Sequence, residues 1–335
     1  MTFPIQPHPT WEIKDSSKLT DFLRCKRYYF YRYILGWTLD YPAHDLHFGQ
    51  CWHLAREYQL LNGYDDIQGA YSVFITEYRK QFPESTDEIY KPKTPNAVLA
   101  GLMKFAEERE SDLIENEVIE LDGRKMTEIS GAVPVDDKRV LHYRMDSIMR
   151  RKIDGKVFSW DHKSTNGKYI MGRQWADQFF LSVQNGTYTH CLYCMFPIED
   201  VLGVEFCGTG FEYLLRGSKN RSAGYHATLR RVSAFKSPDH MNVWIWLILD
   251  TLDDLEAEMD RLFHCNEEDQ ILMAFPMNPK SCTDFRGCPY FDFCLSWQNP
   301  LQRCEDAPLG FRSEFWDPSE QDTRNKLDLK WGGTL

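Results

Sequence analysis

The chain has 335 residues, 42% of them apolar and 27% charged, so it is long enough to bury one large hydrophobic core or two ordinary ones. Its formal net charge of −11 at pH 7 excludes a protein that binds polyanions over its whole surface, but it is compatible with a restricted basic groove. No run of about 18 apolar residues occurs and the N-terminus has no signal-peptide pattern, so we expect a cytoplasmic protein with no membrane partner.

Residues 1–120 are expected to form an N-terminal helical region. An apolar stripe with helical spacing predicts a first helix from about residue 19 to 34, with Cys25 inside it. A second helix is predicted from residue 48 to 61, and it carries His53. Further helices are predicted over residues 66–81 and 95–117.

Residues 121–240 are expected to form an α/β core. A strand pattern at 126–133 and two strand-like runs joined at Asp154-Gly155 together predict a three-stranded meander. A long helical pattern follows from 172 to 196. Strand patterns return at 201–206 and about 225–235, and the basic residues between and within these last strands form either a solvated loop or a patch that tracks phosphates.

The hairpin at Asp154-Gly155 is the most informative local feature, because Asp-Gly between alternating apolar segments favours a type I′ turn. If those two residues form the turn, Asp146 lies opposite Lys163, and Asp161 shares their face. Two carboxylates and an ammonium would then converge. An ordinary solvated salt-bridge face is the alternative interpretation.

Residues 241–304 are expected to begin with a long amphipathic helix and to end in a cysteine-rich segment, and residues 305–335 to form a polar, loosely packed tail. Ten cysteines without an export signal indicate reduced thiols rather than structural disulfides. Cys282, Cys288 and Cys294 form the pattern Cys-x5-Cys-x5-Cys, which is typical of a metal site. Cys304 is a reserve ligand.

The order of these features resembles the RecB-like branch of the PD-(D/E)XK nuclease superfamily, in its iron-sulfur members: CRISPR adaptation nucleases, AddB-type subunits and phage exonucleases. The resemblance implies a restriction-endonuclease-like core, that is, a mixed central β-sheet flanked by helices, with a Cys-ligated cluster tying the C-terminal segment to the N-terminal region. It covers about residues 16–295 and depends on Gly49-x-x-x-His53, Met145-Asp146, Asp161-x-Lys163-Ser164 and Gln184-x-x-x-Tyr188.

The same resemblance implies a Mg²⁺- or Mn²⁺-dependent DNA exonuclease that acts on single-stranded DNA or a duplex end in recombination, repair or processing. Carboxylate oxygens suit Mg²⁺, and an imidazole nitrogen suits Mn²⁺ better. A recombination or replication protein is an expected partner. The implied catalytic residues are Asp146, Asp161, Lys163, Gln184 and Tyr188, and the implied metal ligands are His53, Asp146, Asp161 and, through its backbone carbonyl, His162.

By this resemblance, Lys163 orients or activates water, and Gln184 and Tyr188 position Lys163 or a phosphate. Glu128 and Glu57 are lesser candidates, for which we expect surface salt bridges.

The resemblance also implies that Cys25, Cys282, Cys288 and Cys294 bind a [4Fe-4S] cluster, with Zn²⁺ as the alternative because four thiolates suit either metal. Two non-enzymatic interpretations remain open. One is an iron-sulfur DNA-binding or scaffold subunit with a vestigial nuclease centre, and the other is a zinc-stapled interaction protein.

Overall fold

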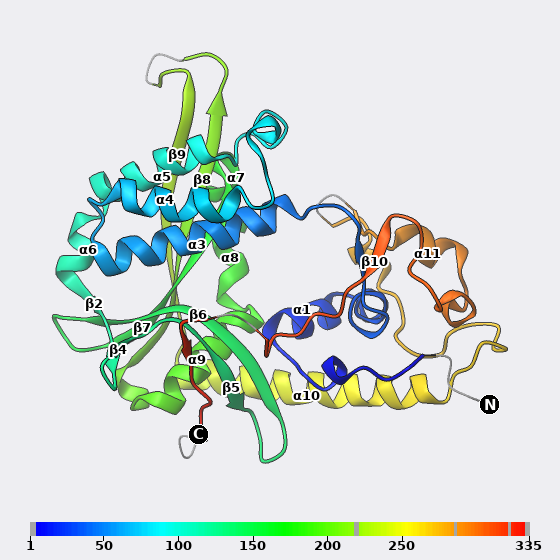
Figure 1. Cartoon of the computed structure of the whole chain (residues 1–335). Coiled ribbons are helices and arrows are strands. Elements are labelled where there is room, and N and C mark those ends of the chain that lie inside the picture. The colour runs from blue at the N-terminus through cyan, green and yellow to red at the C-terminus, as the bar shows by residue number, and fades with distance from the viewer. Residues whose placement is uncertain (1–4, 218–220, 285–286, 321–322, 332–335) are drawn as a thin grey trace.

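The computed structural model describes residues 5–217, 221–284, 287–320 and 323–331 (Figure 1). Within these residues a seven-stranded mixed sheet has the order β11-β5-β6-β7-β8-β9, and β2 pairs with β6 beside this path. Helices lie on both faces of the sheet (Figure 1). The expected α/β architecture with a mixed central sheet flanked by helices is therefore confirmed.

The three strands of the expected meander, β5, β6 and β7, are antiparallel neighbours. β8 runs parallel to β7, and β9 returns antiparallel to β8 as a long hairpin that extends beyond the sheet (Figure 1). The strands are β2 (Asn116–Val118), β5 (Thr127–Pro134), β6 (Val140–Arg151), β7 (Val157–Asn166), β8 (Val201–Leu214), β9 (Gly224–Phe235) and β11 (Asn325–Lys326). Outside this sheet, β3 (Glu120–Leu121) pairs with β4 (Arg124–Lys125).

The turn between β6 and β7 differs from the expected two-residue turn. The backbone N–H of Arg151 donates to the carbonyl of Lys156 at 2.8 Å, so the loop has four residues, 152–155. Asp154 stabilises this longer loop, because its carboxylate accepts from the Lys156 N–H at 3.2 Å and pairs with the Arg151 guanidinium. Gly155 closes the loop with a φ of +72°, which favours glycine.

The longer loop shifts the register of the hairpin by two residues, as the pairing of Ser147 with Trp160 shows. If this register is extended by one residue, Asp146 lies opposite Asp161. The expected pairing of Asp146 with Lys163 is therefore wrong. An even shift keeps the alternation of side chains, and the three residues still share one face.

The helices cover the sheet from two sides. On one side, α9 and α10 pack through residues such as Leu192 and Trp244, and Gly186 has no side chain to obstruct the Trp244 ring. On the other side, α3, α4 and α5 pack through Trp52 against Phe211 of β8. The helices are α3 (His44–Asn62), α4 (Ile67–Tyr78), α5 (Pro95–Glu108), α6 (Glu110–Glu115), α7 (Gly167–Ile170), α8 (Arg173–Phe180), α9 (Val183–Met195) and α10 (Pro238–Phe263).

Three helices that the sequence predicts as continuous are broken. The helices expected over 95–117 and 172–196 are divided, the latter where Ser182 caps α9 by accepting from the Asn185 N–H at 3.2 Å. The first helix is divided into α1 (Ser16–Arg24), α2 (Lys26–Tyr29) and a π-helical turn at 30–34. Cys25 has an extended backbone between α1 and α2, so it does not lie inside a helix.

The C-terminal segment packs against this N-terminal region through aromatic side chains, including Tyr29 and Phe275, whose rings stack at 6.0 Å. Arg27 strengthens the contact by donating to the Phe275 carbonyl at 2.8 Å. The segment contains α11 (Phe291–Ser296). These two distant parts of the chain are therefore held together by packing and hydrogen bonds as well as by any group that the cysteines bind.

The expectation of a loosely packed tail after residue 305 is wrong for the described residues. β10 (Phe311–Ser313) pairs with β1 (Trp37–Leu39), and β11 extends the central sheet parallel to β5. Trp316 donates to Asp15 at 3.2 Å. Gly332 and Gly333 lie outside the described residues. Among the helices that the structure describes, none combines the length and apolar character needed to cross a membrane.

Candidate metal and catalytic site

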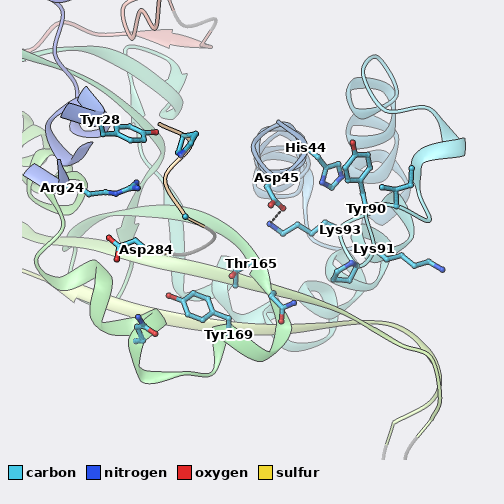
Figure 2. A pocket seen from close by; sticks show the side chains of 16 residues that line it. Arg24, Tyr28, His44, Asp45, Tyr90, Lys91, Lys93, Thr165, Tyr169 and Asp284 are labelled. Carbon is cyan, nitrogen blue, oxygen red and sulfur yellow. Dashed lines mark ion pairs between the residues drawn. The ribbon is translucent and has the colours of Figure 1, made fainter. Parts of the chain in front are cut away.

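Two neighbouring hollows lie at the end of β7, and Asp45 of α3 lines both. The larger, of about 930 Å³, lies between α1–α2 and the beginning of α3, with Thr165 and Tyr169 beneath it (Figure 2). The smaller, of about 360 Å³, is lined by the residues that the sequence predicts to be catalytic.

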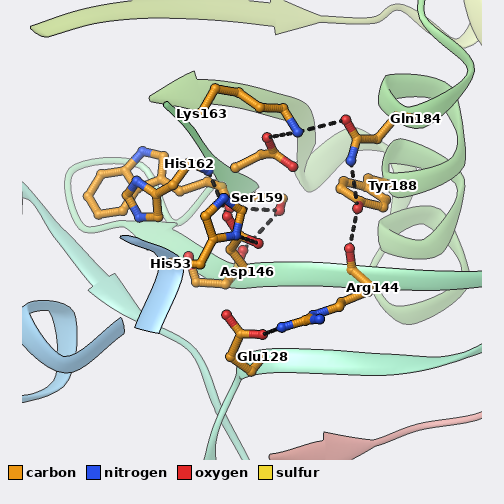
Figure 3. A network of polar contacts seen from close by, with 12 residues as sticks. His53, Glu128, Arg144, Asp146, Ser159, His162, Lys163, Gln184 and Tyr188 are labelled. Atoms are coloured by element: carbon orange, nitrogen blue, oxygen red, sulfur yellow. Dashed lines mark hydrogen bonds and ion pairs between the residues drawn. The ribbon is translucent and has the colours of Figure 1, made fainter. Parts of the chain in front are cut away.

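Asp146 occupies the point where β6 and β7 separate. The ladder between the strands is last seen at Ser147 and Trp160, and beyond it the Asp146 carboxylate accepts from the His162 backbone N–H at 2.7 Å. His53 reaches the same carboxylate from α3, with Nδ1 3.1 Å from Oδ1 (Figure 3). The carboxylate therefore replaces the missing ladder bond and is fixed in position.

Lys163 and Asp161 form the second part of the site. Lys163 Nζ lies 2.7 Å from Asp161 Oδ2 and donates to Gln184 Oε1 at 3.0 Å. Gln184 Nε2 donates to the Tyr188 hydroxyl at 2.9 Å, and that hydroxyl donates to the Arg144 carbonyl (Figure 3). The expected convergence of these side chains on one site is confirmed, and the chain of bonds orients the Gln184 oxygen toward Lys163.

The charges of the site are strongly coupled. Burial by itself opposes ionisation of Asp146, but the adjacent His53 outweighs it and holds the pKa of Asp146 well below its usual range. Burial likewise opposes a charged His53, but Asp146 raises the pKa of the imidazole. Burial and the neighbouring Asp146 raise the pKa of Asp161 in spite of Lys163. A cation at this site would have to compete with a proton on His53.

His162 contributes its backbone rather than its ring to this arrangement. The imidazole is 3% exposed, and burial and the nearby Arg56 lower its pKa well below the usual range. Its ring lies edge-on to Phe105 of α5, with centroids 6.5 Å apart. The ring of His162 is therefore neutral and packs beneath the strand. His162 contributes to the site through its main chain.

Glu128 is the residue that the sequence reasoning undervalued. It is 4% exposed rather than on the surface, and its carboxylate pairs with Arg144 Nη2 at 2.7 Å. Burial and the adjacent Asp146 raise its pKa. The sequence did contain a signal for this burial, because Glu128 lies within a predicted strand of the meander. A charged residue inside a buried strand requires a partner.

Glu57 is also buried, at 9% exposure, and accepts from Thr127 and Arg324 at 2.7 Å each. The expected surface position is wrong for Glu57 too, although its role as an ion-pair partner is confirmed.

The donor set of the site fits a hard divalent cation. Among the described residues, one ligand atom each from His53, Glu128 and Asp146 lies within 4.8 Å of the other two. Two carboxylates and an imidazole are ligands that Mn²⁺ and Mg²⁺ accept. Asp161, directly across from Asp146, provides a further carboxylate on the Lys163 side.

The four predicted cysteine ligands lie in the part of the fold where the N- and C-terminal segments meet, and the thiols of Cys25, Cys282 and Cys288 are near enough to influence Cys294 electrostatically. The Asn278 N–H donates to Cys25 Sγ at 3.3 Å. Burial, and then the nearby thiols of Cys25, Cys288 and Cys282, raise the pKa of Cys294 to about 11 against the effect of Arg27. Cys304 instead faces the Leu301 carbonyl, 3.2 Å away, and its charged neighbours are glutamates.

Three of the basic residues near β8 and β9 are engaged within the protein, whereas Arg216 is exposed and Lys219 lies outside the described residues. Arg221 pairs with Glu212, Arg231 pairs with Asp112, and Arg230 donates to backbone carbonyls. This favours a structural role over the phosphate-tracking patch. The large hollow of Figure 2 presents Arg24 together with the rings of Tyr28, Tyr90 and Tyr169. Its two lysines also have ion-pair partners, because Lys93 pairs with Asp45 at 3.0 Å and Lys91 pairs with Glu88 at 2.7 Å.

Comparison with known protein families finds no family whose pattern the sequence matches, and no curated protein is similar enough in sequence to indicate a relationship.

Proposed function

We propose that the chain is a metal-dependent DNA exonuclease of the RecB-like PD-(D/E)XK type with a restriction-endonuclease-like core. The observation that carries the proposal is the grouping of Asp146, Asp161 and Lys163 with His53 at the point where two strands separate. Hydrolysis of a phosphodiester requires neutralised phosphoryl charge, an activated water and a stabilised leaving oxygen. A divalent cation held by these carboxylates, together with the ammonium of Lys163, would be suited to all three.

His53, Asp146 and Asp161 would hold Mg²⁺ or Mn²⁺, with the main chain of His162 beside them. When bound, such an ion supplies Lewis-acid polarisation of the phosphoryl group and lowers the pKa of water. Two properties prepare Asp146 for this role. Its carboxylate is held in the ionised state by His53, and the hydrogen bond from the His162 N–H fixes its position.

Lys163 orients water and stabilises negative charge that develops on the phosphoryl oxygens. Its ammonium is held by two acceptors, Asp161 and Gln184, so it needs little reorganisation during the reaction. Tyr188 fixes the amide of Gln184, because the Tyr188 hydroxyl accepts from Gln184 Nε2 while it donates to the Arg144 carbonyl. Gln184 and Tyr188 are thus positioning residues for Lys163.

The larger hollow supports a nucleic acid as the substrate. It adjoins the site along β7, from Lys163 to Thr165 and Asn166. Arg24 lies over the ring of Tyr28 at 4.9 Å, and partly exposed aromatic rings beside cations are suited to stacking bases and contacting phosphates. A local groove of this kind reconciles a nucleic-acid substrate with a net charge of −11.

Cys25, Cys282, Cys288 and Cys294 would bind a [4Fe-4S] cluster in a structural role, with Zn²⁺ as the alternative. Four thiolates suit either group, so the choice of the cluster over zinc rests on the family resemblance.

The proposed function is tested with end-labelled single-stranded and duplex DNA in Mg²⁺, Mn²⁺ or chelator. We expect metal-dependent release of short products by the wild-type protein and none by Asp161→Asn. Asp154→Asn, in the turn of the same hairpin, is the control and should retain activity. Binding of DNA without any degradation in either metal would contradict the proposal and favour a scaffold subunit.

A further inference from the structure

The backbone of β5 is distorted at Glu128. Thr127 pairs with Ser147 and Ile129 pairs with Met145, but Glu128 between them has no ladder partner. Its φ is +44°, a left-handed conformation that costs a non-glycine residue about 1–3 kcal/mol. Such a conformation persists only where the surrounding structure enforces it, and here it turns the side chain toward Asp146 and His53.

The Glu128 carboxylate is only half satisfied. Oε2 accepts from Arg144 at 2.7 Å (Figure 3), whereas Oε1 is buried and has no hydrogen-bond partner among the described residues. An unsatisfied oxygen on a buried carboxylate costs free energy, so it points to a missing positively charged partner or donor. Its neighbours are a second carboxylate, on Asp146, and an imidazole, on His53.

We propose that Glu128 is a further direct ligand of the divalent cation, which it would bind together with His53 and Asp146. This inference rests on the proposed function for the presence of an ion, and it adds a ligand that the sequence motifs do not contain. Arg144 serves as the counter-ion of Glu128 through Oε2, which leaves Oε1 to the metal.

The test measures Mn²⁺ binding directly, through the loss of the free-ion electron paramagnetic resonance signal in a titration. Loss of one charged ligand should weaken Mn²⁺ binding by Glu128→Gln about ten-fold or more. Glu57→Gln is the matched control, because Glu57 is a buried carboxylate one turn from His53 whose partners are Thr127 and Arg324. Its Mn²⁺ affinity should equal that of the wild-type protein.

A double variant separates ligation from simple electrostatics. Glu128→Gln alone makes the local net charge more positive by one, whereas Glu128→Gln with Arg144→Gln keeps the net charge of the wild-type pair. If Glu128 is a ligand, the double variant stays weak, and recovery of wild-type affinity would refute the inference. Wild-type affinity in Glu128→Gln itself would refute it as well, and a wild-type protein that binds no Mn²⁺ would overturn the proposed function too.

Discussion

Replacement of Lys163 by Met should separate the structural and chemical contributions of this residue. Met keeps much of the apolar stem but removes the ammonium that contacts Asp161 at 2.7 Å and Gln184 at 3.0 Å. Charge-assisted bonds of this kind contribute about 1.5–3 kcal/mol when buried, and the 29% exposure of the Lys163 side chain screens part of that. We therefore expect the unfolding free energy to fall by about 2 kcal/mol.

The loss of activity in Lys163→Met should be larger than its loss of stability. Removal of one preorganised donor from a site of developing charge costs about 10²–10³-fold in rate, or about 3–4 kcal/mol. Urea denaturation measures the first quantity, and Mn²⁺-dependent DNA degradation, at a temperature where the variant is folded, measures the second.

Lys156→Met is the matched control for Lys163→Met. Lys156 precedes the same strand, its side chain is 32% exposed, and it contacts Asp200 at 3.3 Å and a backbone carbonyl. It should lose a similar or smaller amount of stability and keep full activity. Wild-type activity in Lys163→Met, or an equal loss of activity in Lys156→Met, would refute the assigned role of Lys163.

Three further predictions concern the support of the site and the packing of the chain ends. Gln184→Leu should reduce DNA degradation about 10–100-fold with little change in Mn²⁺ affinity, because it removes a hydrogen-bond acceptor from Lys163 but no metal ligand. A parallel loss of Mn²⁺ binding would contradict this. Cys25→Ser should lower thermal stability and metal content at the cysteine site before it affects chemistry, and normal values of both would remove Cys25 from that site. Burial lowers the pKa of Lys18 to about 8, below the 10.5 of an unfolded chain. The unfolded state thus binds the proton of Lys18 more tightly than the folded state does. The unfolding free energy of the wild-type protein relative to that of Lys18→Met should therefore rise by roughly 2 kcal/mol from pH 7 to pH 9.5. A difference that does not change with pH would contradict the effect of burial on Lys18.

Local patterns were sufficient to predict the parts of the site that depend on periodicity. His53 lies on a helix, and Gln184 and Tyr188 are four residues apart on one face of α9, as helical spacing requires. Asp161 and Lys163 share a face because strand side chains alternate. The turn length was wrong, but an even change in register left this alternation intact.

Features that depend on tertiary contacts were not predictable from local sequence. The break at Cys25 occurs in a stretch with a continuous helical apolar pattern, and it is stabilised by Asn278, which is distant in sequence. Likewise, β11 is a short polar segment whose pairing with β5 uses backbone groups. Gly131 permits that approach, since a Cβ there would overlap the carbonyl oxygen of Leu327.

The separation of β6 from β7 explains why the site forms where it does. If the hydrogen-bond ladder between β6 and β7 continued past Ser147 and Trp160, the His162 N–H would bond to the backbone of β6. The Asp146 carboxylate would then not be needed to satisfy that N–H. Because the strands part, a side-chain carboxylate satisfies that N–H and remains open on its other oxygen to His53. Asp146 is thereby fixed through one carboxylate oxygen, which bonds to the His162 N–H, and in the proposed function the other oxygen would bind the cation.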